Sequence, residues 1–223
     1  MYTEQRIDRA RVLWRSTGST ASVLPADGCL DLILRDGAVH VAGPSTHWLT
    51  TQDDRAEPTV GVRFAPGVAG GLLRVDPAEL RDAFLPLADV VGRRPARAFA
   101  DQLRRLDASS PSAAERGALA GTTEGWVEVV RKYARRGRPV AAVIEELSWS
   151  ERRLRRSMAG TFGYGYTALV RIERARRARS LLAGGWSPAD AAALAGYADQ
   201  PHLTREFRRL VGVTPRQFAD SAA

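Results

Sequence analysis

The sequence predicts an α+β N-terminal part, in which strands are followed by helices, and an all-α C-terminal part. Short alternating runs with turn residues between them occupy roughly the first 65 positions, whereas helix caps and 3.6-residue periodicity dominate after about residue 125. Charge divides the chain in the same way. Residues 126–223 hold 18 Lys/Arg and 9 Asp/Glu, a balance of +9, and residues 1–125 hold 15 and 16, a balance of −1. A basic C-terminal part suggests a polyanionic partner for that part alone.

Strands are predicted first. LDLIL (30–34) and VHVAG (39–43) flank Asp36-Gly37, a dipeptide typical of a tight hairpin turn. TVGVRF (59–64) is a further strand, ended by Pro-Gly, and Arg11–Trp14 is another. These runs indicate a small antiparallel sheet.

Helices and a linker follow the strands. We expect helical structure over VAGGLLRV (68–75) and over DPAELRDAF (76–84), where Asp76 would cap and Pro77 would occupy the first helical position. A further helix is expected over 95–106. SSPSAAERG (109–117) is small and polar, so we predict an N-terminal domain over 1–108, a linker over 109–125 and a second domain over 126–223.

The second domain is predicted to be helical throughout. Ser150, Ser187 and Asp199 are placed as N-caps, and Pro188 follows its cap at the first helical position. The predicted helices cover 126–135, 140–147, 151–162, 167–183, the stretch opened by Ser187, and the stretch opened by Asp199.

The stretch GYADQPHLTREFRRLVGVTP (196–215) has the pattern of the second half of a helix–turn–helix. Leu203, Phe207 and Leu210 form an apolar stripe for packing. The polar residues that begin this helix are Gln200, His202, Thr204 and Arg205, with Pro201 among them. A recognition helix places its base-contacting side chains at this end when it enters a major groove.

These residues resemble a known family. G-Y-x-D-Q-x-H-L-x-R-x-F-R-R-x-x-G-x-x-P is similar to the signature of AraC/XylS-type bacterial transcription regulators, and upstream Ser150, Leu154, Arg156, Gly163 and R-A-x-x-A-x-x-L-L (174–182) fit it as well. The resemblance covers about residues 126–220. It implies two helix–turn–helix units joined by a linker helix, reading adjacent major-groove segments of a bipartite double-stranded operator.

The resemblance also implies the DNA-binding residues. Arg152 and Arg156 match base-edge positions, and Arg153 and Arg155 match base or phosphate contacts. The full set is Arg152, Arg153, Arg155, Arg156, Gln200, His202, Thr204 and Arg205. Because Arg binds guanine bidentately, a G-rich half-site is expected for the first unit.

The N-terminal part resembles an uncharacterised β-rich domain of short regulators. L-P-x-D-G-C-x-D-L-I (24–33), A-G-P (42–44) and G-V-R-F-x-P-G (61–67) carry this resemblance, which implies a small β-barrel-like sheet plus helices in the sensor position. Three roles are left open for it: binding a small-molecule effector, mediating dimerisation or partner contact only, and sensing a metal or electrophile through Cys29.

Candidate ligand-binding residues in this part are Trp14, Trp48, Arg63 and Phe64, which could line a pocket. The alternative is that the aromatic residues belong to the core, as aromatic residues on strands more often do. Cys29 lies between Asp27 and Asp31, whose charge would raise its pKa, so a packed thiol is favoured over a redox sensor. A metal site of Cys29 with His40 and His47 is the weaker alternative, and no metal or cofactor is predicted.

The sequence lacks the motifs of the common catalytic sites, including GxSxG, HExxH and Walker loops, so no enzyme activity is expected. It holds no apolar run of membrane-spanning length and no signal peptide, and one cysteine excludes an internal disulfide. We therefore expect a cytoplasmic regulator. RNA polymerase, a small-molecule effector and a second copy of the chain are the further partners left open.

Overall fold

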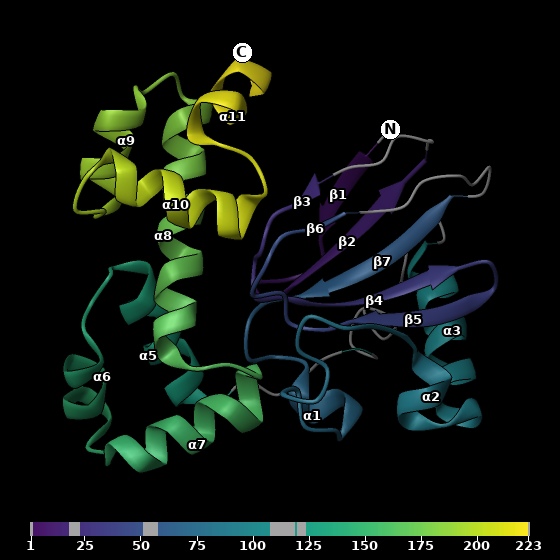
Figure 1. Cartoon of the computed structure of the whole chain (residues 1–223). Helices are drawn as coiled ribbons and strands as arrows, with labels where there is room; N and C mark the ends of the chain where they lie inside the picture. The colour runs from purple at the N-terminus through teal and green to yellow at the C-terminus, as the bar shows by residue number, and fades with distance from the viewer. Residues whose placement is uncertain (1, 18–22, 51–57, 108–118, 120–123, 223) are drawn as a thin grey trace.

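A sheet-rich N-terminal half and a helical C-terminal half lie side by side in the computed structural model of the chain (Figure 1). The structure describes residues 2–17, 23–50, 58–107, 119 and 124–222. The predicted order of an α+β part followed by an all-α part is confirmed.

The N-terminal half is built on one antiparallel sheet of six strands, in the order β1-β2-β7-β4-β5-β8, with β3 and β6 forming a separate pair. The strands are β1 (Tyr2–Arg6), β2 (Arg11–Ser16), β3 (Val23–Leu24), β4 (Leu30–Arg35), β5 (Ala38–Ala42), β6 (Leu49–Thr50), β7 (Thr59–Phe64) and β8 (Phe84–Pro86). The predicted hairpin is β4–β5, and its turn residues Asp36 and Gly37 both have positive φ, of 51° and 74°, as the tightest hairpin turn requires. β1 and β8 are the two edges of this sheet, so it is open where a barrel-like sheet was expected.

The two faces of the sheet differ because side chains alternate along each strand. Leu13, Val62, Leu32 and Val41 lie opposite one another on β2, β7, β4 and β5, and all are buried in the core of this half. Helix α3 (Arg93–Asp107) packs against β4, β5 and β7, and it contributes Ala96, Ala100, Leu103 and Leu106 to the same core. The opposite face carries polar groups.

The segment between β7 and α3 departs from the predicted helices. Only α1 (Gly70–Leu73) forms in the first predicted stretch, and α2 (Leu87–Val91) was not predicted. The predicted helix over 76–84 is wrong: the chain makes successive turns there, with the amide of Leu80 donating to the carbonyl of Pro77 at 3.2 Å. Asp82 then adopts a left-handed backbone (φ 57°) and the chain enters β8, which pairs with β5. Sheet pairing outweighs local helix propensity here.

The C-terminal half consists of seven helices within the described residues. They are α5 (Gly125–Arg135), α6 (Val140–Leu147), α7 (Glu151–Phe162), α8 (Tyr166–Ala183), α9 (Pro188–Ala195), α10 (Gln200–Val211) and α11 (Pro215–Ala222). All three predicted N-caps are confirmed, since the side chains of Ser150, Ser187 and Asp199 each accept a bond from the backbone amide three residues on. Helix α11 was not predicted.

Helix α8 is the centre of this half. Leu169, Ile172, Ala175 and Leu182 are buried along it, as their spacing predicts, and α5, α9, α10 and α11 all pack against it. The rest of the core comes from the helices on either side, so α8 holds one group of helices at each of its ends (Figure 1).

The two halves are joined by direct contacts. The hydroxyl of Tyr164, buried after α7, donates to the carbonyl of Gly28 at 3.0 Å, and the carbonyl of Leu210 in α10 accepts from the amide of Ala26 at 2.7 Å. At Gly163 the backbones approach so closely that a Cβ would lie 2.6 Å from the carbonyl oxygen of Pro77. The predicted linker 109–125 falls almost entirely outside the described residues, so the proposed domain boundaries stay a prediction.

Candidate nucleic-acid interface

Helix α7 is the first candidate recognition helix. A left-handed residue, Ser148 (φ 52°), ends α6, and the Ser150 cap starts α7 two residues later, which produces a tight helix–turn–helix. Leu154 and Met158 are buried on the inner side of α7. The four predicted contact residues, Arg152, Arg153, Arg155 and Arg156, are all exposed.

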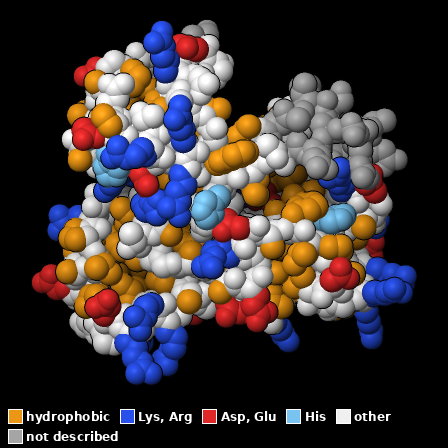
Figure 2. Space-filling model, in the orientation of Figure 1, with side chains coloured by type: hydrophobic (Ala, Val, Ile, Leu, Met, Phe, Trp, Pro, Cys, Tyr) orange, Lys and Arg blue, Asp and Glu red, His pale blue; other side chains and the backbone are white. Residues whose placement is uncertain are grey.

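The exposed arginines of α7 are available to an anion. The guanidinium of Arg153 stacks over the ring of Trp149 at 4.2 Å, which fixes its direction. Within the described part of the chain, Arg152, Arg155 and Arg156 form no ion pair. Blue side chains accordingly project from the lower left of the molecule in Figure 2, where Figure 1 places α7.

Helix α10 is the second candidate. Gly196 ends α9 in a left-handed conformation (φ 84°), and Asp199 caps α10 by accepting from the amide of His202 at 2.6 Å. The His202 ring stands edge-on to Tyr197, with centroids 5.3 Å apart, and the Thr204 hydroxyl donates to the carbonyl of Gln200 at 3.0 Å. His202 and Thr204 are thus half-buried and locally bonded, whereas the side chains of Gln200 and Arg205 are exposed.

Arg171 on α8 orients α10. Its guanidinium donates two hydrogen bonds to the carboxylate of Glu206, at 2.5 and 2.7 Å. Burial raises the pKa of Glu206, but the hydrogen bonds and charge of Arg171 outweigh it and hold that pKa below its ordinary value. Arg174 lies over the ring of Tyr197 at 5.4 Å and supports the turn before α10.

Arg177 connects the helices at the two ends of α8. It donates to the carbonyl of Ala195 at the end of α9, at 3.3 Å, and to the carbonyl of Arg135 at the end of α5. A cation at two helix C-termini satisfies carbonyls that have no partner within their helices. No contacts were predicted for Arg171, Arg174 and Arg177, because helical periodicity holds no signal for bonds to distant helices.

The 18 residues of α8 separate the two units. At 1.5 Å per residue the helix is about 27 Å long. This is shorter than the roughly 34 Å repeat of DNA, but the widths of the helices that flank α8 add to the separation of the two units. The arrangement can present two polar and cationic helix ends to neighbouring groove segments.

The four candidate ligand residues do not form one group. Trp14 and Arg63 share the polar face of the sheet, where the Trp14 indole N–H donates to Asp31 at 2.6 Å and the Arg63 guanidinium lies 3.3 Å from Asp31. Phe64 points to the other face and is fully buried in the core. Trp48 is 40% exposed and lies against Gly212 of the C-terminal half. The pocket predicted from these residues stays a prediction.

The polar face contains a compact charged cluster of Asp27, Asp31 and Arg63. Burial raises the pKa of Asp31 to about 6, and the charge of Arg63 opposes that shift. The Trp14 ring can cross to Asp31 because Gly61 on the intervening strand has no side chain, and a Cβ there would overlap the ring. Sequence reasoning singled out these residues separately but not their contact, which depends on strand order.

Cys29 is half-buried, and burial together with Asp27 and Asp31 raises the pKa of its thiol well above the ordinary value. Raising the pKa lowers the thiolate fraction and hence reactivity. His40 stacks on Phe84 at 5.1 Å, and His47 lies 3.4 Å from Asp82. The residues that the structure describes include no cluster of three or more His, Cys, Asp or Glu that could hold a metal. Over the same residues, every helix is too short or too polar to cross a membrane.

Family models match a segment in each half of the chain. Residues 143–221 match a helix-turn-helix domain, and residues 6–86 match a domain of unknown function. The resemblance of the C-terminal part to AraC/XylS-type regulators is thereby confirmed. No curated protein is a significant match.

Solved structures of similar fold were also found. ToxT from Vibrio cholerae is 12% identical, with 98% of each chain covered and a TM-score of 0.50. The C-terminal domain of AraT, a response regulator from Geobacillus stearothermophilus, is 23% identical over 44% of this chain and 86% of that chain, with a TM-score of 0.41. The likeness to ToxT extends over both halves and concerns the fold.

Proposed function

We propose that this chain, a DNA-binding transcription regulator with an AraC/XylS-type helix-turn-helix domain, reads a bipartite operator with α7 and α10. The observation that carries the proposal is the pair of capped helices on α8, each with exposed polar or cationic side chains near its N-terminus. A helix N-terminus also carries unpaired N–H groups and a partial positive charge, so it suits contact with phosphate.

The two helices contribute differently to this reading. In α7, Arg152 and Arg156 contact base edges, and Arg153 and Arg155 contact bases or phosphates. In α10, Gln200 and Arg205 reach the groove, while His202 and Thr204 contact the backbone or bases near the helix start. Phosphate contacts set register and affinity, and base contacts set sequence preference.

The N-terminal half is the regulatory part in this proposal. It binds a small-molecule effector, and the direct bonds from Ala26 and Gly28 to the C-terminal half support transmission of that binding to α7 and α10. Dimerisation through this half is the second candidate, favoured by the open sheet with edge strands β1 and β8. Contact with RNA polymerase would then occur on the DNA-bound form.

Selection of bound duplexes from a random pool tests the function. The full chain is incubated with the pool at near-physiological salt, which suppresses nonspecific phosphate binding. We expect a consensus of two half-sites about one helical turn apart. Enrichment of one half-site alone would contradict reading of the operator by both α7 and α10. No enrichment, with cell extract or without it, would contradict sequence-specific binding.

The same selection with residues 126–223 tests the domain division. We expect the fragment to select the same consensus, because α7, α8 and α10 share one core. A fragment that folds, as judged by circular dichroism, but binds no DNA would place the boundary elsewhere.

A further inference from the structure

We propose that a loop between α5 and α6 is a third DNA contact, which binds the backbone of the spacer between the two half-sites. This arginine loop, residues 135–138, carries Arg135, Arg136 and Arg138, and all three are exposed. In Figure 1 the connection from α5 to α6 lies beside the middle of α8, below α10 and above α7. The inference rests on the proposed function and adds a contact that neither recognition helix makes.

Hydrogen bonds hold the arginine loop between the two helix–turn–helix units. The guanidinium of Arg177 on α8 donates to the carbonyl of Arg135 and, at 3.3 Å, to the carbonyl of Ala195 at the end of α9. The hydroxyl of Tyr166, at the start of α8, donates to the carbonyl of Arg138 at 2.8 Å. The loop is therefore tied at one end to the turn that leads into α10 and at the other to the part of α8 that follows α7.

The backbone of the arginine loop is also fixed by its own bonds. Gly137 has a left-handed backbone (φ 64°), and its amide donates to the carbonyl of Ala134 at 2.9 Å. The amide of Arg138 donates to the carbonyl of Tyr133 at 3.0 Å. This pair of bonds is a Schellman cap, which ends α5 abruptly. Because the backbone is already ordered, DNA binding has to immobilise only the arginine side chains.

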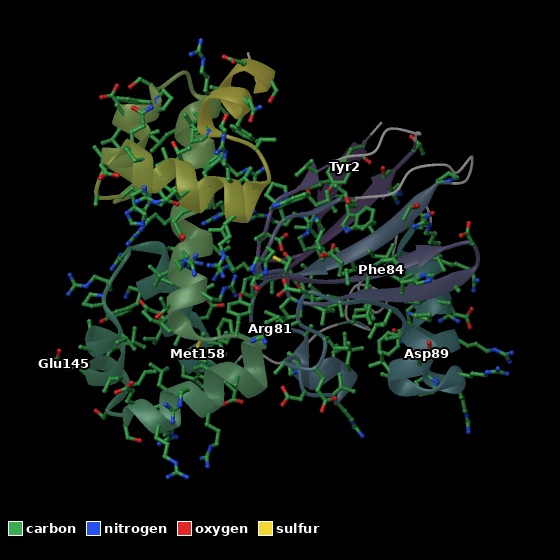
Figure 3. The ribbon with its side chains drawn as sticks, viewed as in Figure 1. Tyr2, Arg81, Phe84, Asp89, Glu145 and Met158 are labelled. Atoms are coloured by element: carbon green, nitrogen blue, oxygen red, sulfur yellow. The ribbon has the colours of Figure 1, made fainter. Side chains whose placement is uncertain are left out.

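Neighbouring acids do not neutralise the arginine loop. Over the described residues, none of its three arginines forms an ion pair. Of the two acids on α6, Glu146 accepts from the hydroxyl of Tyr133 at 2.8 Å, and Glu145 lies at the outer edge of the molecule (Figure 3). Adjacent guanidinium groups without an acidic partner favour an external anion, and phosphate is the anion that DNA presents.

The shape of DNA places a minor groove opposite the arginine loop. Two major-groove segments one helical turn apart, about 34 Å, have a minor groove between them on the same face of the duplex. With α7 and α10 in the two major grooves, the middle of α8 lies over that minor groove and the two phosphate strands that border it. The loop also comes directly before α6, and the first helix of a helix–turn–helix crosses the DNA backbone.

A contact at this place makes affinity depend on the sequence of the spacer. Tracts of A·T pairs narrow the minor groove and strengthen its negative potential, which attracts arginine without any base contact. We therefore expect the chain to prefer an A·T spacer over a G·C spacer, although neither recognition helix reaches the spacer.

The salt dependence of binding to the selected duplex tests the contact with the full chain. Each phosphate contact adds about 0.9 to the slope of log affinity against log salt. Arg136→Ala combined with Arg138→Ala should lower the slope by about 1–2 and weaken binding about tenfold at near-physiological salt. The matched control combines Arg94→Ala with Arg97→Ala, which removes two exposed charges from α3. It should leave the slope unchanged.

Neutral phosphates locate the contact on the DNA. Methylphosphonates in place of the phosphates that border the spacer minor groove should weaken wild-type binding about tenfold. The loop double variant should lose little further affinity on this duplex, because the two changes remove the same interaction. Melting curves confirm that each variant folds. Losses that simply add would overturn the contact.

The remaining outcomes separate this inference from the proposed function. A loop double variant that binds the selected duplex with an unchanged salt slope would overturn the third contact and leave reading by α7 and α10 intact. Equal wild-type affinity for A·T and G·C spacers would overturn the spacer preference. If the random pool returned no bipartite consensus, there would be no spacer, and the proposed function and this inference would both fail.

Discussion

Helix α7 exposes four arginines, and among the described residues the side-chain contact that holds one of them is the stack of Arg153 on Trp149. Helix α10 exposes fewer cations at its start, and its middle is fixed to α8 by the Arg171–Glu206 pair. The first helix suits strong attraction to phosphate and guanine, and the second suits reading from a fixed orientation. In the proposed reading of the operator, the two units of the same motif divide affinity and register between them.

The largest expected effect concerns the cores of the two units. Phe207 in α10 and Met158 in α7 are both fully buried. Phe207→Ala should lower the free energy of unfolding by about 3–5 kcal/mol, because a large buried ring is removed from a packed core. Met158→Leu, which conserves volume, should cost under about 1.5 kcal/mol. Denaturant titration measures both; equal losses would mean that α10 contributes less to the fold than its packing indicates.

The next largest expected effect is the loss of DNA affinity when a single base-contacting arginine is replaced. Arg156→Ala in α7 and Arg205→Ala in α10 should each weaken binding to the selected duplex by about 1–3 kcal/mol and relax base preference at one position. Titrations on the selected duplex and on scrambled duplexes separate the two kinds of contact. A residue whose loss weakens binding equally on every duplex is a phosphate contact.

The Arg171–Glu206 pair gives a smaller and pH-dependent effect. Glu206→Gln should lower the free energy of unfolding by about 1 kcal/mol at pH 7, since the pair is only partly buried. Because Arg171 holds the pKa of Glu206 below its ordinary 4.5, the stabilising contribution is present above pH 4.5 and is lost as the pH falls through the lower, folded-state pKa. Unfolding measured from pH 7 to pH 3 should bring the wild type and variant together at the acid end. A difference that grows on acidification would contradict this sign.

The smallest expected effect lies at Arg153. Arg153→Lys keeps the charge but loses the planar stack on Trp149, and DNA affinity should fall by about 0.5–1 kcal/mol. Arg155→Lys, at an exposed position without such a stack, is the matched control and should change affinity less. If both substitutions cost the same, the Trp149 contact does not orient the guanidinium for binding.

Local signals predicted the C-terminal half well. Ser150, Ser187 and Asp199 start their helices where capping chemistry places them, and Gly196 ends α9 in the left-handed conformation that glycine allows. The strand over 59–64 and the Asp36-Gly37 turn were predictable for the same reason, because each depends on neighbouring residues only.

What depends on distant residues was not predictable. Strand β8 forms because β5 offers it an edge, which local helix propensity over 76–84 does not reflect. The contact of Trp14 with Asp31 depends on β7 lying between their strands. For the candidate DNA contacts, the sequence predicts exposure and side-chain type. It does not predict the Arg171–Glu206 bonds that orient α10 or the Arg177 bonds that join α8 to α9 and α5, because these residues lie 18 to 42 positions apart.

The close approach at Gly163 also limits how such a protein can be recombined. With no room for a Cβ beside the carbonyl of Pro77, the C-terminal half meets the N-terminal half only if glycine stands at this position. A chimera that joins this N-terminal half to another helix-turn-helix domain would keep the interface only where the incoming domain supplies a glycine there. The interface therefore depends on a specific fit between the backbones of the two halves, which restricts the domains that could replace either half.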